Sequence, residues 1–200
     1  MTSSVKEYHH GNLYAALLTE AEKLLPETGA AGLSLREVAR RTGVSHGAPR
    51  RHFPDKQALL SALAENGYER LGAQLDAALD GAEGTFTERL TAFATAYVDF
   101  AVRHGALLDL MFTSKNWPDA DHLLRANERA FAAPVQLLAR ARAVGEITDG
   151  DAERVDMAVL AVLQGLAVMA HAGLAGTRPM ADVVSGTVTT LADGLRPRRS

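Results

Sequence analysis

The stretch SLREVARRTGVSHGAPRRHFPDK, residues 34–56, decides the fold of the N-terminal part of this chain. Ser34 is a good helix N-cap, and Glu37 stands three residues later, where it can complete a capping box. Gly43 suits the left-handed residue that ends such a helix, and Ser45 can cap a second helix of about eight residues, HGAPRRHF. The pattern therefore predicts a helix-turn-helix, which places its second helix in the major groove of DNA.

The same stretch is basic although the whole chain is acidic. Residues 36–56 contain six Arg or Lys and two acids, a local charge of +4, whereas the net charge of the chain is −3. Such a concentration of positive charge favours binding to the phosphate backbone of DNA. The alternative is a solvated basic face on an ordinary helical hairpin, and the turn residues argue against it.

The segment LREVARRTGVSHGAPRRHFPDKQALL resembles the DNA-binding signature of the tetracycline-repressor (TetR) family. With the upstream segment YHHGNLYAALLTEAEKLLPETGAAG, the resemblance covers roughly residues 8–62. It implies an all-α fold, with an N-terminal three-helix module that contains the helix-turn-helix and a C-terminal helical domain for effector binding and dimerisation. The DNA contacts that it implies, together with one basic residue added from the motif itself, are Ser34, Arg36 (the addition), Ser45, His46, Gly47, Arg50, Arg51, His52 and Lys56.

One dipeptide departs from the family pattern. The chain has Pro49-Arg50 where the family usually has Leu-Tyr, and that Tyr commonly contacts a phosphate. Arg50 can take over the phosphate contact or bind a guanine edge with two hydrogen bonds, and both roles stay open. Pro49 is compatible with a helix only near its first turn.

Composition and motifs exclude several other classes of protein. The chain has no cysteine, so disulfides and thiolate zinc sites are ruled out, and its N-terminus lacks the apolar core of a signal peptide. We expect no cofactor and no metal; the adjacent His9 and His10 have no further ligands at suitable spacing. An enzyme is disfavoured, because no catalytic motif is present and the polar residues from Asp119 to His122 fit a solvated helix start. We expect a prokaryotic cytoplasmic protein, located at the nucleoid when it binds DNA.

Hydrophobic periodicity predicts helices along the whole chain and no strand. The expected organisation is a DNA-binding domain (residues 1–54), a connecting helix (55–80) and an effector-binding and dimerisation domain (81–200). Besides the two helices of the motif, the expected helices are 12–27, 55–79, 85–103 with a capping box at its start, a short apolar helix ALLDLMF, 118–144 with a bend at Pro134, 151–174 and 180–195.

The last two helices are expected to form a homodimer. Residues 157–176 carry no formal charge over about the length of a membrane span, but the segment is rich in Ala and Gly, and a subunit interface explains it better. Two helices from each subunit would form a four-helix interface and present two recognition helices to a palindromic operator. The candidate interface residues are Val155, Val159, Val162, Leu166, Met169, Val184, Val188 and Leu191.

Aromatic and apolar side chains between the DNA-binding module and the interface suggest an effector pocket. Ordinary core packing explains most such residues singly, while the family resemblance implies a pocket in this region. The candidates are Phe93, Tyr97, Phe100, His104, Leu107, Met111, Phe112, Trp117, Gln164 and His171. We expect an apolar or aromatic effector to bind there, pivot the connecting helix and release DNA from a repressor. An activator, a regulator without an effector, an architectural DNA-binding protein and a helical enzyme are the alternatives.

Overall fold

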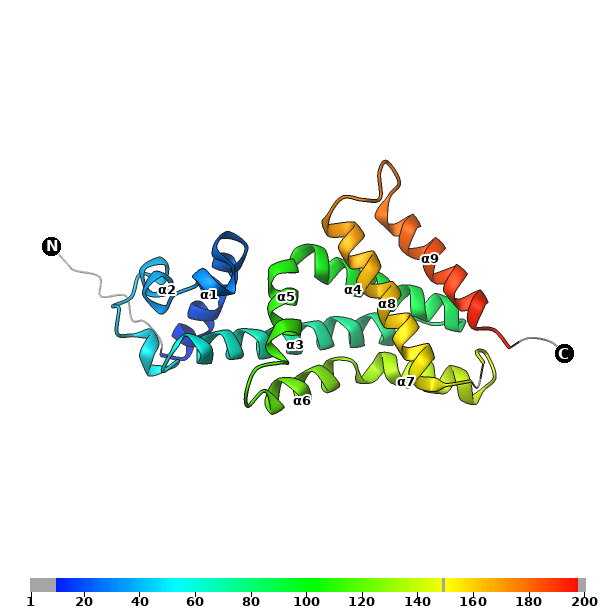
Figure 1. The fold of residues 1–200 in the computed structure, drawn as a ribbon, viewed down its shortest axis with the longest axis horizontal. Helices are drawn as coiled ribbons and strands as arrows, with labels where there is room; N and C mark the ends of the chain where they lie inside the picture. Colours follow the sequence, from blue (N-terminus) through cyan, green and yellow to red (C-terminus); the bar gives the residue numbers. More distant parts are fainter. Residues whose placement is uncertain (1–9, 149, 198–200) are drawn as a thin grey trace. The chain divides into compact units, whose positions relative to one another are not determined.

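The computed structural model describes residues 10–148 and 150–197, excluding the side chains of residues 10–12. Within these ranges there is no strand, so the predicted all-α class is confirmed (Figure 1). The predicted cap Asn12 and the histidine pair at residues 9–10 have side chains outside the described part. The elements are α1 (His10–Gly32), α2 (Leu35–Thr42), the 3₁₀ helix η1 (Pro49–Arg51), α3 (Lys56–Asp80), α4 (Phe86–Arg103), α5 (Gly105–Ser114), α6 (Asp121–Ala130), α7 (Ala132–Ala143), α8 (Ala152–His171) and α9 (Met180–Leu195).

The chain forms two compact units. The first unit comprises residues up to 67 together with residues 106–123, and the second comprises residues 68–105 and those from 124 onward. Helix α3 contributes to both units, as does α5. The helix-turn-helix segment lies wholly in the first unit.

The core of the first unit is formed by side chains from α1, α2 and the start of α3. Helix α1 packs against α2. Leu17 and Leu24 of α1, Val38 of α2, Phe53 and Leu59 are all buried. Helix α1 is longer than predicted, because the backbone continues helically to Gly32 across a kink at Gly29, which has a left-handed φ of 64°.

Helix α4 lies at the centre of the second unit, where it packs against α7, α8 and α9. Its predicted capping box is confirmed: the Thr85 amide donates to Glu88 Oε2 at 2.8 Å, and the Glu88 amide donates to Thr85 Oγ1 at 3.3 Å. The box fixes the start of α4 at Phe86. The buried face of α4 includes Phe93, Tyr97 and Phe100.

The single bent helix predicted for residues 118–144 is wrong, because two helices occupy this segment. Helix α6 ends at Ala130 and α7 begins at Ala132. Pro134 has no N–H group, so it cannot donate to the carbonyl of Ala130, four residues earlier, as a continuous helix requires. Pro134 instead occupies the first turn of α7, where no such donor is needed.

Candidate nucleic-acid interface

Both ends of α2 lie at the predicted residues. The Glu37 amide donates to Ser34 Oγ at 3.2 Å, which is the N-cap bond. At the other end Gly43 has a left-handed φ of 75°, and the Val44 amide donates to the carbonyl of Ala39 at 3.0 Å. The return half of the predicted capping box is wrong, because the Glu37 carboxylate pairs with Arg40 instead.

The predicted second helix HGAPRRHF is much shorter in the structure. Residues 46–48 form turns, and only Pro49–Arg51 is helical, as the 3₁₀ helix η1. The amide of Ala48 donates to the carbonyl of Ser45 at 2.9 Å, and the amides of His52 and Phe53 donate to that of Pro49 at 3.0 and 2.8 Å. Since Pro49 has no amide proton and Gly47 weakens a helix, the regular α-helical bonding cannot be established before Pro49. The backbone nevertheless keeps a helical sense up to Phe53, which is buried.

Almost all of the predicted DNA-contacting residues are exposed. The exposed ones are Ser34, Arg36, Ser45, His46, Gly47, Arg50, Arg51 and His52. Lys56 is partly buried, and its Nζ donates to the carbonyl of Ala31 near the end of α1. The charge of Lys56 therefore stands beside a helix C-terminus, where a cation is favourable.

Internal ion pairs compensate the charges of two arginines in the motif. Arg40 makes two hydrogen bonds to Glu37, at 2.6 and 2.9 Å, and Arg41 pairs with Glu27 at 2.5 and 3.0 Å. The hydrogen bonds from Arg40 are the main reason that the pKa of Glu37 falls to about 2, with Arg41 adding to the effect. Both arginines are thus partly neutralised as phosphate ligands.

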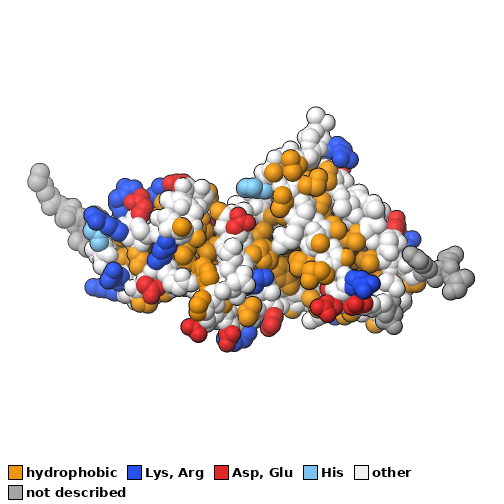
Figure 2. Space-filling model, in the orientation of Figure 1, with side chains coloured by type: hydrophobic (Ala, Val, Ile, Leu, Met, Phe, Trp, Pro, Cys, Tyr) orange, Lys and Arg blue, Asp and Glu red, His pale blue; other side chains and the backbone are white. Residues whose placement is uncertain are grey.

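Three other arginines form what we call the basic patch: Arg36, Arg50 and Arg51. None of them makes an ion pair or a side-chain hydrogen bond to another residue in the described ranges. Figure 2 shows Lys and Arg side chains gathered with a histidine at the end of the molecule that holds α2. The basic patch can therefore bind phosphates or base edges without breaking an existing contact.

Sequence analysis missed one residue beside the motif, Tyr14 of α1. Its ring lies 6.0 Å from that of His52, in an edge-on arrangement, and 5.1 Å from that of Phe53. Tyr14 is 42% exposed. An exposed aromatic residue on the first helix was the only available signal, and its neighbour 38 positions later could not be deduced from periodicity.

The candidate effector residues are divided between the two units. Those in the second unit are Phe93, Tyr97, Phe100, His104, Gln164 and His171, and those in the first are Leu107, Met111, Phe112 and Trp117. Tyr97 is fully buried, and its hydroxyl has no hydrogen-bond partner among the described residues. Burial, with a contribution from Tyr68, raises the pKa of Tyr97, so its hydroxyl stays protonated. Tyr68 itself lines a cavity of about 270 Å³ in the second unit, together with residues of α6 and α3.

The candidate interface residues are mostly buried within the chain itself. The buried ones are Val155, Val159, Leu166, Val184 and Val188, and the partly buried ones are Val162, Met169 and Leu191. The exposed apolar side chains of α8 lie on another face, with Met157 60% and Val168 61% exposed. Among the described helices, α8 is also the one that is long and apolar enough to cross a membrane, judged by length and composition alone.

Two protein-family models match the chain. Residues 17–63 match the model of bacterial regulatory proteins of the tetR family, and residues 90–192 match the tetracyclin repressor-like C-terminal domain. No curated protein shows significant similarity to the chain. The first match contains the whole helix-turn-helix segment, and the second contains α8 and most of α4 and α9.

Solved structures give the same fold over nearly the full length. A protein of unknown function from Rhodococcus sp. RHA1 is 41% identical, with a TM-score of 0.87, and the match covers 96% of this chain and 100% of the other. A regulatory protein of the tetR family from Rhodococcus RHA1 (16% identity, TM-score 0.73, 93% and 98% covered) has the same fold. So does the TetR-family transcriptional regulator PfmR from Thermus thermophilus (21%, 0.71, 90% and 99%). The chain belongs to the TetR family of transcriptional regulators.

Proposed function

We propose that the protein is a repressor that binds a palindromic operator as a homodimer and releases it when a small molecule binds the second unit. The observation that carries the proposal is the basic patch. Arg36, Arg50 and Arg51 are exposed and have no internal partner in the described part of the chain, although they surround a helix-turn-helix. Buried or paired arginines in these places would have argued against DNA binding.

The exposed residues of the turn suggest separate roles in DNA recognition. Ser45, His46 and Gly47 precede η1 and present short or polar groups to base edges, while Arg50 and Arg51 reach further. Phosphate contacts fix the position of a protein on the duplex, and base contacts give specificity. We assign Arg51 to a phosphate and leave Arg50 with two testable roles, a phosphate or a guanine.

The exposed face of α8 supports the homodimer. Met157, Ala161, Gly165 and Val168 are all exposed, and their spacing of four, four and three residues places them on one side of the helix. A stripe of small residues flanked by larger apolar ones allows two helix backbones to approach closely. Figure 2 shows apolar side chains gathered over this helix. Because a soluble protein rarely leaves such a face in water, we assign it to a second copy of the chain, through α8 and α9.

The buried hydroxyl of Tyr97 supports a polar contact with the effector. An unpaired buried hydroxyl is costly, and a ligand that accepts its hydrogen bond would remove the cost. The surrounding rings of Phe93 and Phe100 favour an apolar or aromatic body for that ligand. Binding should lower operator affinity, and operator should lower effector affinity by the same factor.

Selection of bound sequences from random DNA by the purified protein tests operator binding. We expect one palindrome to be enriched and to bind at least 1,000-fold more tightly than bulk DNA at the same salt, a ratio on the order of the lower limit for specific binders. Equal affinity for the palindrome and for shuffled DNA would contradict the proposal and favour an architectural protein.

Arginine variants separate the two roles of Arg50. If Arg50 binds a phosphate, Arg50→Ala weakens binding to all sequences and reduces the slope of log K against log salt by about 0.9. If it binds a guanine, the variant relaxes specificity at one position of the site at a cost of about 1–3 kcal/mol. The matched control is Arg125→Ala, an exposed arginine outside the motif, which should leave operator affinity unchanged.

Sedimentation of a charge variant tests the homodimer. Val168→Glu places a charge in the exposed stripe of α8 and should convert the dimer to a monomer. Val135→Glu, at a position on α7 that is 52% exposed, is the control and should stay dimeric. A wild-type monomer at micromolar concentration would contradict the assignment, and recovery of the protein in the membrane fraction would favour a membrane role for α8.

A further inference from the structure

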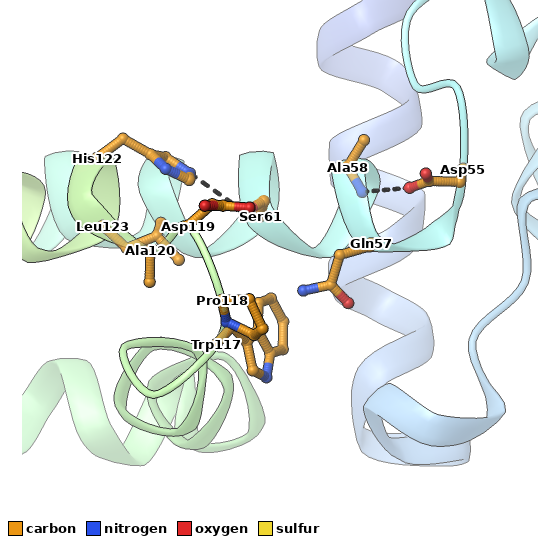
Figure 3. A pocket seen from close by; sticks show the side chains of 10 residues that line it. All are labelled: Asp55, Gln57, Ala58, Ser61, Trp117, Pro118, Asp119, Ala120, His122 and Leu123. Carbon is orange, nitrogen blue, oxygen red and sulfur yellow. Dashed lines mark hydrogen bonds between the residues drawn. The ribbon is translucent and has the colours of Figure 1, made fainter.

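The first unit contains a cavity that is separate from the candidate effector region of the second unit. Its volume is about 260 Å³. Figure 3 shows that the lining residues come from the start of α3 and from the segment that precedes and begins α6. They are Asp55, Gln57, Ala58, Ser61, Trp117, Pro118, Asp119, Ala120, His122 and Leu123.

A hydrogen bond links the two sides of this cavity. Ser61 Oγ of α3 and His122 Nε2 of α6 lie 3.2 Å apart (Figure 3). This pair has the form of half a nucleophile–base arrangement, but no other described residue forms a hydrogen bond with the His122 ring. We therefore interpret the pair as polar lining that fixes the two walls of a binding site.

The charged lining residues are both acids. Asp55 uses one carboxylate oxygen as the cap of α3, accepting from the Ala58 amide at 2.8 Å. Asp119 is exposed and has a left-handed φ of 60°, a conformation that Asp tolerates better than most residues. No Lys or Arg belongs to the ten lining residues, so the cavity attracts cations and repels anions.

The third element of the cavity is the indole of Trp117. Trp117 is partly buried and borders the cavity beside Pro118. The face of an indole binds flat apolar groups and also attracts cations. The cavity thus joins an aromatic wall, two carboxylates and a hydrogen-bonded Ser–His pair in one unit of the protein.

We propose that this cavity binds a small organic cation that carries a flat apolar group, such as an arylalkylamine. The ammonium group would lie between Asp119 and the Ser61–His122 pair, and the ring would lie on Trp117. The volume lies just below the range for drug-sized ligands, so the ligand is small. This site stands apart from the proposed operator function, because its test uses protein without DNA.

Trp117 is the only tryptophan of the chain, so its fluorescence reports directly on this cavity. Three probes of nearly equal size differ in charge: 2-phenylethylamine (cation), 2-phenylethanol (neutral) and 3-phenylpropanoate (anion). We expect saturable change of the Trp117 emission with the amine at a Kd on the order of 1 mM, which is reasonable for about nine heavy atoms. The alcohol should bind about fivefold more weakly, and the anion should show no saturation.

Asparagine variants test the charge without disturbing the backbone. Asn tolerates the left-handed conformation at residue 119 and caps a helix as well as Asp at residue 55. Asp119→Asn should weaken binding of the amine about fivefold, the upper value for an exposed ion pair, and the double variant with Asp55→Asn by roughly 10- to 25-fold. The control is the double variant Asp99→Asn and Asp109→Asn, two exposed acids outside the cavity, which should leave the Kd unchanged.

Three outcomes would overturn the proposal. These are the absence of a saturable change in Trp117 emission with the amine, equal Kd values for the three probes, and equal weakening by the cavity and control variants. The last outcome would mean that net charge alone attracts the amine. None of these results depends on whether an operator has been found.

Discussion

Replacement of Tyr97 by Phe is expected to stabilise the protein, although it removes a polar group from a buried tyrosine. Tyr97 is fully buried in α4, and its hydroxyl has no hydrogen-bond partner in the described part of the chain. An unsatisfied buried hydroxyl costs about 1–3 kcal/mol in free energy of unfolding. Phe keeps the ring and its packing, including the contact with Phe131 at 6.2 Å between ring centres. The variant leaves a space of only one oxygen atom, so we expect a net gain of about 1 kcal/mol.

Thermal unfolding followed by circular dichroism measures this gain. For a protein of this size, 1 kcal/mol corresponds to a rise in Tm of about 2–4 °C. Protein concentration must be the same for all variants, because dimerisation makes the Tm depend on it. Tyr14→Phe is the matched control: Tyr14 is exposed, so loss of its hydroxyl should change the free energy of unfolding by less than about 0.5 kcal/mol.

A fall in the Tm of Tyr97→Phe would refute this reasoning. A loss of 1 kcal/mol or more would mean that the hydroxyl is hydrogen-bonded in the native protein, and the hydroxyl would then give no support to an effector contact. If the Tm rises as expected, an effector that pairs with the hydroxyl should bind Tyr97→Phe more weakly than the wild type.

Two further predictions concern α2. Gly43→Ala should cost roughly 1–2 kcal/mol in urea denaturation, because Gly43 has a left-handed φ of 75° and an added Cβ would meet no neighbour, so backbone strain is the whole effect; Gly43→Asn should cost less, and equal stability of Gly43→Ala and the wild type would contradict the assignment. The Glu37 carboxyl should titrate near its pKa of about 2, well below the ordinary 4.5, because of its hydrogen bonds from Arg40. Its contribution to stability is therefore present above pH 4.5 and is lost as the pH falls towards 2; a midpoint near 4.5 in carbon NMR would rule out these hydrogen bonds in solution.

Local signals in the sequence predicted the framework of the DNA-binding unit. The ends of α2 follow from Ser34 and Gly43, and the start of α4 follows from Thr85 and Glu88, because each cap is a bond between residues close in sequence. The helix expected after Ser45 was wrong for an equally local reason: Pro49 removes the amide on which a regular helix would depend.

Features that depend on distant residues could not be predicted in this way. Sequence alone counts Arg41 as a free cation, but the fold brings Glu27, fourteen residues earlier, into contact with it. Helix α8 is apolar on nearly all sides, so its pattern does not show which face meets α4 and which stays exposed. The cavity beside Trp117 joins residues about 60 positions apart, and no spacing rule connects Ser61 with His122.

The shortness of η1 limits how much operator sequence one subunit can specify. A 3₁₀ helix rises about 2 Å per residue, so its three residues extend over about 6 Å, less than two steps of about 3.4 Å between base pairs. In terms of information, each half-site then carries only a few strongly selected positions, and much of the discrimination depends on the distance between the two halves. We expect natural operators of this regulator to vary in their bases while they keep a fixed spacing between half-sites.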